Sequence, residues 1–558
     1  MGKTERMTEL DSEGLRNEWA AAEFARLTAG DDEEASRLAD RQHELERELL
    51  KAAKEEGRKP GAGRSTSEWW NADRPKRRPL RFAIIGAGVG GLAMGARLRE
   101  AGYDDFVIIE KSDGVGGTWH FNNYPGVACD VASYFYSFTF YKNPDWSQMF
   151  APGAEIKQYL SDLADHYRLR EKTSFNSTVT ACRYSDGKWH VSTAEGKTFD
   201  ADVLIPATGF LHIPVLPEIE GLESFAGEAF HSSKWSPELD MSGKRVGVIG
   251  NGSSSVQIVS NIVDEVDALT VFQRTPQWVF PAPNDHYSTQ RREMLSYYPE
   301  LMERLFDYFM DWYNDGFGNA VVGDADAQKR FFDACQANID SVSDPELRAK
   351  LTPDYPVMCK RLVFSNSYFK ALEKPNCDLE TRGIARIEPK GVRLQDDALI
   401  ELDMLVLATG FDTHAYCRML NISVEGGQTL TEAWSEGARS FESIGLAGFP
   451  NMFFVSGPFS TVGNLSTMTC AELQVDHIIR LLDEMDRTGA NEVMPDRKAE
   501  DEFLDEMQQA AKKTVWLSGC TSWYLDKAGG VDIWTKTPAS FMDRMVEGPD
   551  LSKYVFSD

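Results

Sequence analysis

The chain falls into two parts that differ in how apolar and polar positions alternate. Near the start, residues 13–28 and 32–56 are predicted to form two helices, and Leu38, Leu45, Leu49 and Ala52 give the second one an apolar stripe. From residue 81 onward, strand-like apolar runs recur: RFAIIG, DFVIIE, DVLIPATG, KRVGVIG, ALTVFQR, DMLVLATG and NMFFVSG. Strands that alternate with helical stretches in this way predict an α/β fold with parallel sheets.

A glycine-rich turn follows the first of these strands. Gly86, Gly88 and Gly91 have the spacing G-x-G-x-x-G and lead into a helix. Such a turn lets the backbone approach a pyrophosphate at the positive end of the helix. The next strand ends in Glu110, where an acid accepts hydrogen bonds from ribose hydroxyls and repels a 2′-phosphate. The turn therefore predicts a site for an unphosphorylated adenosine, as in FAD or NAD.

A second turn of this type follows the strand KRVGVIG. It contains Gly250, Gly252, Ser253, Ser254 and, in place of a third glycine, Ser255. The following strand ends in Arg274 and Thr275, at the place where the first site has its acid. A guanidinium and a hydroxyl suit a 2′-phosphate, which favours NADPH over NADH. Two sites of opposite charge preference predict a hydride donor and a hydride acceptor, hence a flavoprotein reductase core.

Composition narrows the class of protein. The 558 residues include 59 Lys and Arg against 87 Asp and Glu, a net charge of −28, which argues against general binding to nucleic acid or anionic membranes. No apolar run reaches the roughly 18 residues that cross a bilayer, and the N-terminus lacks the apolar centre of a signal peptide. The eight cysteines form no C-x-x-C pair and no metal-like cluster. We therefore expect a soluble cytoplasmic protein with free thiols and no metal.

The segment between the two glycine turns carries the most specific pattern. Phe225, Gly227, His231 and Trp235 have the spacing F-x-G-x-x-x-H-x-x-x-W. Here the sequence resembles the Baeyer–Villiger monooxygenases, in which this fingerprint also lies between two Rossmann motifs. Further matching stretches extend from about residue 80 to 530: GVGGTWHFNNYPGVACDVAS, VFQRTPQW, CKRLVFSNSYF, two A-T-G-F segments, GFPNMFFVSGP and CTSWY.

The resemblance implies a reaction and roles for individual residues. NADPH reduces FAD, oxygen adds at flavin C4a, and the peroxide converts ketones to esters or lactones. Arg361 matches the cation that keeps this peroxide deprotonated, and Asp130 matches the carboxylate that positions it. Lys360 joins Arg274 and Thr275 at the 2′-phosphate of NADPH.

Other matches are implied to lie near the cofactors. Gly117, Thr118, Trp119 and Asp130 belong to the stretch beside the flavin, and Trp523 is either a contact of the bound nucleotide or a packed aromatic residue. For His231 and Trp235, a role at the domain junction is as consistent with the resemblance as one in the chemistry.

The implied fold has two Rossmann-like dinucleotide-binding domains, with the NADPH domain inserted into a discontinuous FAD domain. We expect a helical N-terminal extension and linker in residues 1–79 and the first part of the FAD domain in 80–210. The NADPH domain is expected in 211–395, with a helical insertion at 281–352, and the second part of the FAD domain in 396–558. The extension is predicted to be either a loosely docked solvated segment or an element for dimerisation or partner binding.

Two other functions compete with ketone oxygenation. Oxygenation of an amine or sulfide requires an electrophilic peroxide, and Trp235 and Arg361 weigh against it. A non-catalytic nucleotide-binding protein is disfavoured by the intact glycine turns and by Lys360 and Arg361. The expected partners are a small ketone and oxygen, in a monomer or homodimer. The sequence does not indicate whether the ketone is linear, cyclic, aryl or steroidal.

Overall fold

The computed structural model describes residues 11–27, 32–61, 74–460, 465–526 and 528–558. By its internal contacts the chain divides into two compact units. Unit 1 comprises residues 1–72, 131–151 and 284–312, and unit 2 comprises 73–130, 152–283 and 313–558. Part of the predicted linker, residues 62–73, lies outside the described residues.

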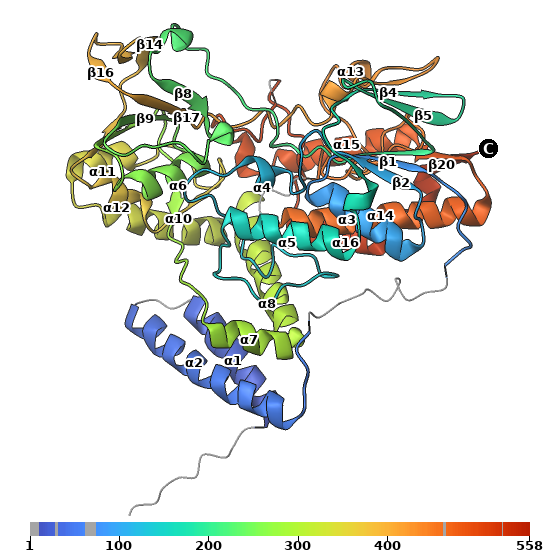
Figure 1. Ribbon diagram of the computed structural model, residues 1–558, viewed down its shortest axis with the longest axis horizontal. Coiled ribbons are helices and arrows are strands. Elements are labelled where there is room, and N and C mark those ends of the chain that lie inside the picture. The colour runs from blue at the N-terminus through green and yellow to red at the C-terminus, as the bar shows by residue number, and fades with distance from the viewer. Residues whose placement is uncertain (1–10, 28–31, 62–73, 461–464, 527) are drawn as a thin grey trace, which may run out of the picture. The chain divides into compact units, whose positions relative to one another are not determined.

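Unit 1 is helical. Its helices are α1 (Ser12–Leu27), α2 (Asp32–Glu55), α7 (Thr289–Tyr297) and α8 (Pro299–Trp312), so the two helices predicted near the N-terminus are confirmed (Figure 1). A buried ion pair joins α1 to α7, because Arg291 Nη2 lies 2.9 Å from Glu23 Oε1. Burial favours the neutral form of Glu23, but Arg291 and Arg26 lower its pKa to about 2, so the pair stays charged. The N-terminal helices therefore pack with α7 and α8 as parts of one unit.

The first parallel sheet of unit 2 has the strand order β3-β2-β1-β7. Its strands are β1 (Phe82–Ile85), β2 (Phe106–Ile109), β3 (Thr173–Ser174) and β7 (Val203–Pro206), and α3 (Val89–Ala101) connects β1 to β2. β1 is buried along its whole length and pairs with both β2 and β7. α3 packs against α5 (Gly153–His166) and α14 (Thr467–Thr488) (Figure 1).

The second parallel sheet of unit 2 has the order β13-β10-β9-β17-β8. Its strands are β8 (Glu228–His231), β9 (Arg245–Ile249), β10 (Ala268–Phe272), β13 (Cys377–Glu380) and β17 (Met404–Leu407), with α6 (Ser253–Ile262) between β9 and β10. Two parallel sheets, each with a helix after its first glycine turn, confirm the α/β prediction.

One strand of the second sheet lies beyond a predicted boundary. We expected the NADPH domain to end at residue 395, but β17 lies between β9 and β8 and pairs in parallel with both. β17 therefore belongs to the second sheet although it lies beyond residue 395, and the second A-T-G-F segment, Ala408–Phe411, directly follows it. A central strand adds more hydrogen bonds to a sheet than an edge strand does, because both of its edges are paired. The sequence alone does not specify which strands pair.

The remaining elements surround these sheets. The strands are β4 (Val179–Ser185), β5 (Lys188–Thr193), β6 (Thr198–Ala201), β11 (Val279–Phe280), β12 (Val363–Phe364), β14 (Ile384–Glu388), β15 (Gly391–Leu394), β16 (Leu399–Glu401), β18 (Ile422–Val424), β19 (Glu492–Pro495) and β20 (Tyr554–Ser557). The helices are α4 (Thr118–Phe121), α9 (Asn319–Val321), α10 (Ala325–Asp340), α11 (Pro345–Leu351), α12 (Tyr368–Leu372), α13 (Leu430–Ala433), α15 (Arg497–Ala511) and α16 (Pro538–Glu547).

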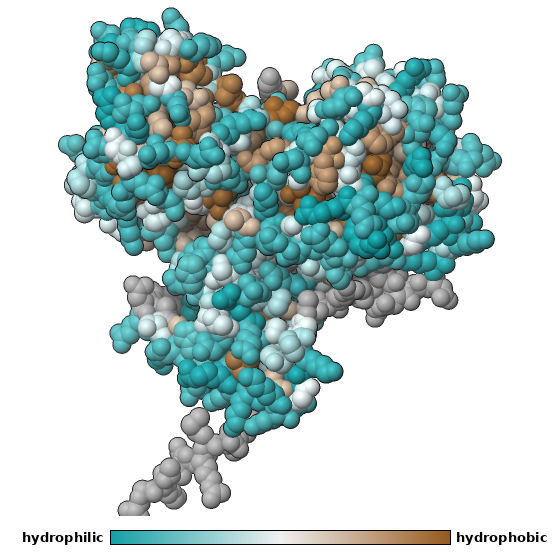
Figure 2. Space-filling view, viewed as in Figure 1, coloured by the Kyte–Doolittle hydropathy of each residue, from teal (hydrophilic) through white to brown (hydrophobic). Residues whose placement is uncertain are grey.

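The segment predicted as a helical insertion, residues 281–352, is fully described, and its regular structure is helical from α7 to α11. It does not form one body, because residues 284–312 belong to unit 1 and the rest to unit 2. Hydrophilic residues cover most of the face seen in Figure 2, in keeping with the net charge of −28. Among the described helices, none combines the length and the apolar character of a membrane span.

Candidate functional site

The first glycine turn directly follows the end of β1. A Cβ on Gly86 would lie 2.7 Å from the carbonyl oxygen of Ala207, and one on Gly91 would lie 1.8 Å from the Gly86 oxygen. These positions therefore require glycine. The N-cap of α3 is Gly88, and no side chain caps the helix, which leaves its first backbone N–H groups for an anionic ligand. Glu110 is buried and accepts hydrogen bonds from the backbone N–H groups of Ala87 and Ser112.

A second glycine lies against this turn. Gly117 has φ +54°, and a Cβ there would lie 2.8 Å from the Cα of Gly88. It begins α4, on which Thr118 and Trp119 follow; Thr118 is exposed and Trp119 is half-buried. The turn is thus a narrow cradle of backbone, which fits the pyrophosphate of a flavin dinucleotide.

Substituting this glycine should weaken flavin binding. We expect Gly117→Ala to raise the FAD dissociation constant by about tenfold or more, since the strained φ and the contact with Gly88 each oppose the native loop. The ratio of flavin to protein absorbance in the purified enzyme measures this. Gly187→Ala is the matched control: its φ is +74°, but nothing lies within 4 Å of the added carbon. Equal flavin loss in both variants would contradict the assignment.

The second glycine turn is built in the same way. A Cβ on Gly250 would lie 2.4 Å from the Ala408 oxygen, whereas the space at Gly252 is open. Ser253 and Ser254 form the N-terminus of α6, again without a side-chain cap. Ser255, at the third glycine position, is fully buried, so serine is small enough for the helix to pack there.

Two cations lie near this turn. Arg274 is exposed, and neither it nor Lys360 forms an ion pair with any described residue. Burial and the neighbouring charge of Arg274 lower the pKa of Lys360. The Lys360 ammonium also lies 4.5 Å from the ring centre of Tyr355. Asn251 holds the adjacent loop, because its Nδ2 donates to the Thr275 oxygen at 2.7 Å. The charge of Asp354 also acts on Lys360, but neither cation is paired with it in an ion pair. Two adjacent positive charges of this kind favour a phosphate ligand.

Arg361 and Asp130, far apart in the sequence, meet in a two-pronged ion pair. Arg361 Nε donates to Asp130 Oδ2 at 3.0 Å and Nη2 to Oδ1 at 2.8 Å. Burial lowers the pKa of Arg361, but the Asp130 carboxylate and the Tyr524 and Tyr313 hydroxyls outweigh it, so the pKa lies above its ordinary value. The Arg361 side chain is 29% exposed. The guanidinium is therefore permanently charged and fixed in direction, on a side chain that remains partly exposed.

Hydrogen bonds join the Asp130 segment to the second glycine turn. The Tyr124 hydroxyl lies 3.1 Å from Ser254 Oγ and 3.0 Å from Gln257 Oε1. Gln257 Nε2 donates to the Ala128 oxygen at 3.0 Å. Both partners are on α6, so the segment that carries Asp130 is tied to the helix that follows the second glycine turn.

Trp523 lies where the chain crosses between the two sheets. Its ring stacks on Phe210, with centroids 6.3 Å apart, and packs at a tilt against Tyr524, with centroids 4.3 Å apart. Its backbone oxygen accepts a hydrogen bond from Thr413. Phe210 and Thr413 belong to or follow the two A-T-G-F segments, and these segments pair with each other through Pro214 and Phe411.

The fingerprint residues gather around β8. A Cβ on Gly227 would lie 2.2 Å from the Asp403 oxygen, so glycine permits β8 to approach β17. Phe225 and Trp235 are buried, and Trp235 packs edge-on against Phe230. His231 Nδ1 accepts from the Ser233 N–H, so Nε2 carries the hydrogen and donates to the Gly410 oxygen at 3.0 Å. His231 thus ties β8 to the second crossing segment, which favours a role at the junction.

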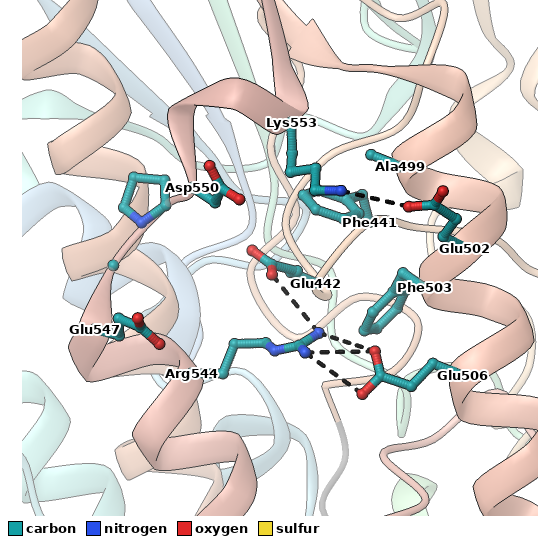
Figure 3. A pocket seen from close by; sticks show the side chains of 12 residues that line it. Phe441, Glu442, Ala499, Glu502, Phe503, Glu506, Arg544, Glu547, Asp550 and Lys553 are labelled. Carbon is teal, nitrogen blue, oxygen red and sulfur yellow. Dashed lines mark hydrogen bonds and ion pairs between the residues drawn. The ribbon is translucent and has the colours of Figure 1, made fainter.

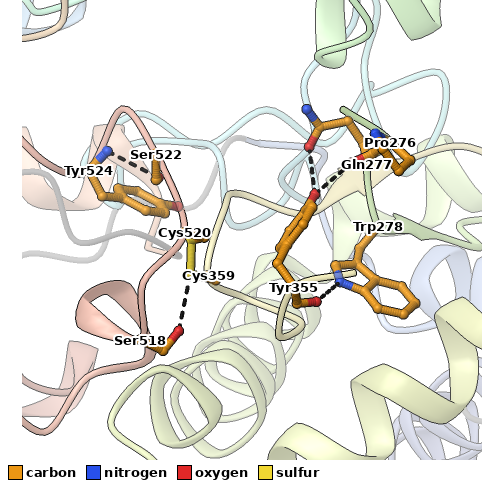
Figure 4. Close-up of a disulfide and its surroundings, with 9 residues drawn as sticks. All are labelled: Pro276, Gln277, Trp278, Tyr355, Cys359, Ser518, Cys520, Ser522 and Tyr524. Atoms are coloured by element: carbon orange, nitrogen blue, oxygen red, sulfur yellow. Dashed lines mark hydrogen bonds between the residues drawn. A yellow bond between two sulfur atoms is a disulfide. The ribbon is translucent and has the colours of Figure 1, made fainter. Parts of the chain in front are cut away.

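The expectation of free thiols is wrong for two cysteines. Cys359 and Cys520 form a disulfide, with Cα atoms 6.3 Å apart and a sequence separation of 161 (Figure 4). The other six are buried thiols. No short motif marks this pair, because only folding brings the segment before Lys360 next to the C-terminal one.

A pocket of about 530 Å³ lies apart from these residues. Glu442, Glu502, Glu506, Glu547 and Asp550 line it, together with Arg544 and Lys553 (Figure 3). Burial raises the pKa of Glu442 to about 7. None of the predicted site residues lines this pocket, so it has no part in the proposed chemistry. Within the described ranges, no group of three His, Cys, Asp or Glu residues is arranged to hold a metal ion.

Comparisons with known proteins show the family to which the chain is similar. Residues 83–301 match the family described as pyridine nucleotide-disulphide oxidoreductase. The chain is 37% identical over 492 residues to a Baeyer-Villiger monooxygenase of Streptomyces coelicolor, an alignment that covers 85% of this chain and 92% of the relative. It is 39% identical over 458 residues to an uncharacterized monooxygenase of Mycobacterium tuberculosis, with 82% and 92% covered.

Two solved structures have a fold similar to that of this chain. Cyclohexanone monooxygenase from Rhodococcus bound to NADP⁺ has a TM-score of 0.77 at 27% identity, with 86% of this chain and 99% of that chain covered. OTEMO in complex with FAD and NADP has a TM-score of 0.77 at 27% identity, with 87% and 100% covered. The chain therefore belongs to the Baeyer–Villiger monooxygenase family and is an FAD- and NADPH-dependent monooxygenase.

Proposed function

We propose that this enzyme inserts one oxygen atom beside the carbonyl of a ketone and so forms an ester or lactone. The Arg361–Asp130 ion pair supports this proposal, because it fixes a permanent positive charge on a segment that hydrogen-bonds to the helix after the second glycine turn. FAD, once reduced by NADPH, supplies the activated oxygen. The chain must then stabilise negative charge on that oxygen and on the carbonyl that it attacks.

Arg361 is suited to this task. Its guanidinium donates hydrogen bonds but does not act as an acid, so it stabilises an oxyanion without protonating it. Asp130 takes two of its N–H groups and so fixes the plane of the guanidinium. Asp130 acts as a positioning residue, since its own oxygens face the arginine.

The second turn binds and orients NADPH in this proposal. Arg274 and Lys360 pair with the 2′-phosphate, Thr275 donates its hydroxyl to it, and the N-terminus of α6 at Ser253 and Ser254 faces the pyrophosphate. Trp523 covers the nucleotide from the crossing segments. Water is thereby kept from the reacting atoms.

Product analysis tests the reaction class. NADPH consumption is measured with linear, cyclic, aryl and steroidal ketones, and with an amine and a sulfide of similar size, and the product mass is determined. We expect one added oxygen in ketone products and no oxygenation of the amine. Preferred oxygenation of the amine or sulfide would favour heteroatom chemistry, and NADPH consumption without any oxygenated product would contradict both.

We also propose that the enzyme acts in the cytoplasm, where NADPH is supplied, as a monomer or homodimer. Light scattering coupled to gel filtration measures its mass in solution. A mass above that of a dimer would contradict the proposed assembly.

A further inference from the structure

The disulfide lies next to the residues that the proposed function uses. Cys359 directly precedes Lys360 and Arg361 and is fully buried. Cys520 is half-buried and lies three residues before Trp523. Figure 4 shows the bond between the Cys359 loop and the segment that runs from Ser518 to Tyr524. One covalent bond thus connects the catalytic cation to the segment that covers the nucleotide.

We propose that Cys359 and Cys520 form a peroxide-driven redox brace, which in its oxidised form holds Arg361 and Trp523 in place and retains the nicotinamide nucleotide. This inference rests on the proposed function of Arg361 and Trp523. It assigns a site of oxidative modification to the cysteine pair.

Non-covalent contacts between the two segments are few among the described residues. Ser518 Oγ lies 3.3 Å from Cys359 Sγ. Tyr524 is buried and hydrogen-bonds with Arg361, while its ring packs against Trp516 with centroids 4.8 Å apart. Residues 517–519 between these contacts are exposed. Without the disulfide, the contacts of Ser518 and Tyr524 still join the two segments, and Phe210 and Thr413 still contact Trp523. Reduction should therefore loosen mainly the exposed residues 517–519.

The chemistry requires only hydrogen peroxide, which flavin monooxygenases release when oxygen is not transferred to substrate. One cysteine thiolate attacks the peroxide, the O–O bond breaks, and a sulfenic acid and one water form. The second thiolate attacks this sulfur, the S–O bond breaks, the disulfide forms and a second water leaves. In sum, two thiols and one peroxide give one disulfide and two waters.

In this proposal, the disulfide lowers the release of the hydrogen peroxide that forms it. A loosened segment releases nucleotide early and exposes the site to water, so more peroxide escapes. This peroxide closes the disulfide, which holds the segment and lowers the leak. Cytoplasmic thiols reopen it.

Thiol counting tests whether the bond forms. The full-length holoenzyme, first reduced and then treated with a small excess of hydrogen peroxide, is denatured and alkylated. We expect eight alkylated cysteines before peroxide and six after it, with a crosslinked peptide joining Cys359 and Cys520. Eight alkylated cysteines after peroxide, or a crosslink between other cysteines, would overturn the proposal.

Binding measurements test whether the bond acts as a brace. The NADP⁺ dissociation constant and the peroxide released per NADPH are compared for the oxidised enzyme, the reduced enzyme, Cys359→Ala and Cys520→Ala. We expect the last three to bind NADP⁺ about tenfold more weakly than the oxidised enzyme. Trypsin cleavage near Lys512 and Lys513 should also become faster. Cys182→Ala, in the buried core of the flavin domain, is the matched control and should behave as the wild type does in both redox states.

The outcomes separate the brace from the proposed function. If the bond forms but all forms bind NADP⁺ equally, the disulfide is not a brace and the proposal fails. If Cys359→Ala does not fold, the comparison of oxidised and reduced wild type and of Cys520→Ala still decides the question. If the wild type oxygenates no ketone while NADP⁺ affinity still follows the disulfide, the proposed function fails and the brace stands.

Discussion

Arg361→Ala is expected to abolish ester formation while NADPH still reduces the flavin. Removing one preorganised donor from an oxyanion site costs about 10² to 10³ in rate, and this variant also loses a full positive charge. Reduction of the flavin does not need this cation, so oxygen should still be consumed. Because oxygen is no longer transferred to the ketone, the electrons should leave as hydrogen peroxide. Stopped-flow absorbance follows flavin reduction, and gas chromatography with a peroxide assay measures the partition between ester and peroxide.

Two further variants make this result specific. Arg361→Lys keeps the charge but cannot form both hydrogen bonds to Asp130, so partial recovery of ester formation is expected. Arg245→Ala removes a similar two-pronged pair with Asp403 at the start of β9, the end of the strand away from the glycine turn. It should change the rate less than about twofold. Undiminished ester formation in Arg361→Ala would show that another residue supplies the cation.

Arg274→Ala should raise the KM for NADPH about thirtyfold and leave the KM for NADH nearly unchanged. A charge-assisted hydrogen bond to phosphate is worth about 2 kcal/mol, which is about thirtyfold in affinity. NADH has no 2′-phosphate and provides the reference within the same protein. Initial rates of flavin reduction at varied nucleotide concentration give both constants.

Two lysine variants test this prediction further, one expected to share the effect and one serving as the control. Lys360→Ala should act in the same direction, because Lys360 and Arg274 influence each other electrostatically. Lys390→Ala removes an exposed charge at the turn between β14 and β15 and should leave the ratio of the two KM values unchanged. Equal effects of Arg274→Ala on NADPH and NADH would refute the phosphate assignment.

Local pattern was sufficient for the elements and for the two turns. In both turns, the backbone either approaches another part of the backbone or leaves space for a ligand, at glycines 86, 88, 91, 250 and 252. Such positions need glycine, and glycines at short spacing can be recognised directly in the sequence. The N-terminal helices were predictable from their apolar stripe, because a 3.6-residue period depends only on neighbours in sequence. The roles of Arg361 and Asp130 came from resemblance and not from their surroundings.

The sequence by itself determined the α/β class and the order of the two glycine turns, and it predicts the charge preference of each turn, since these features depend on contacts within about 30 residues. Tertiary structure alone decided that β17 belongs to the second sheet, that residues 284–312 pack with the N-terminal helices, and that Cys359 meets Cys520. Each of these is a contact between segments far apart in the chain. Its free energy comes from burial and pairing that no local pattern encodes.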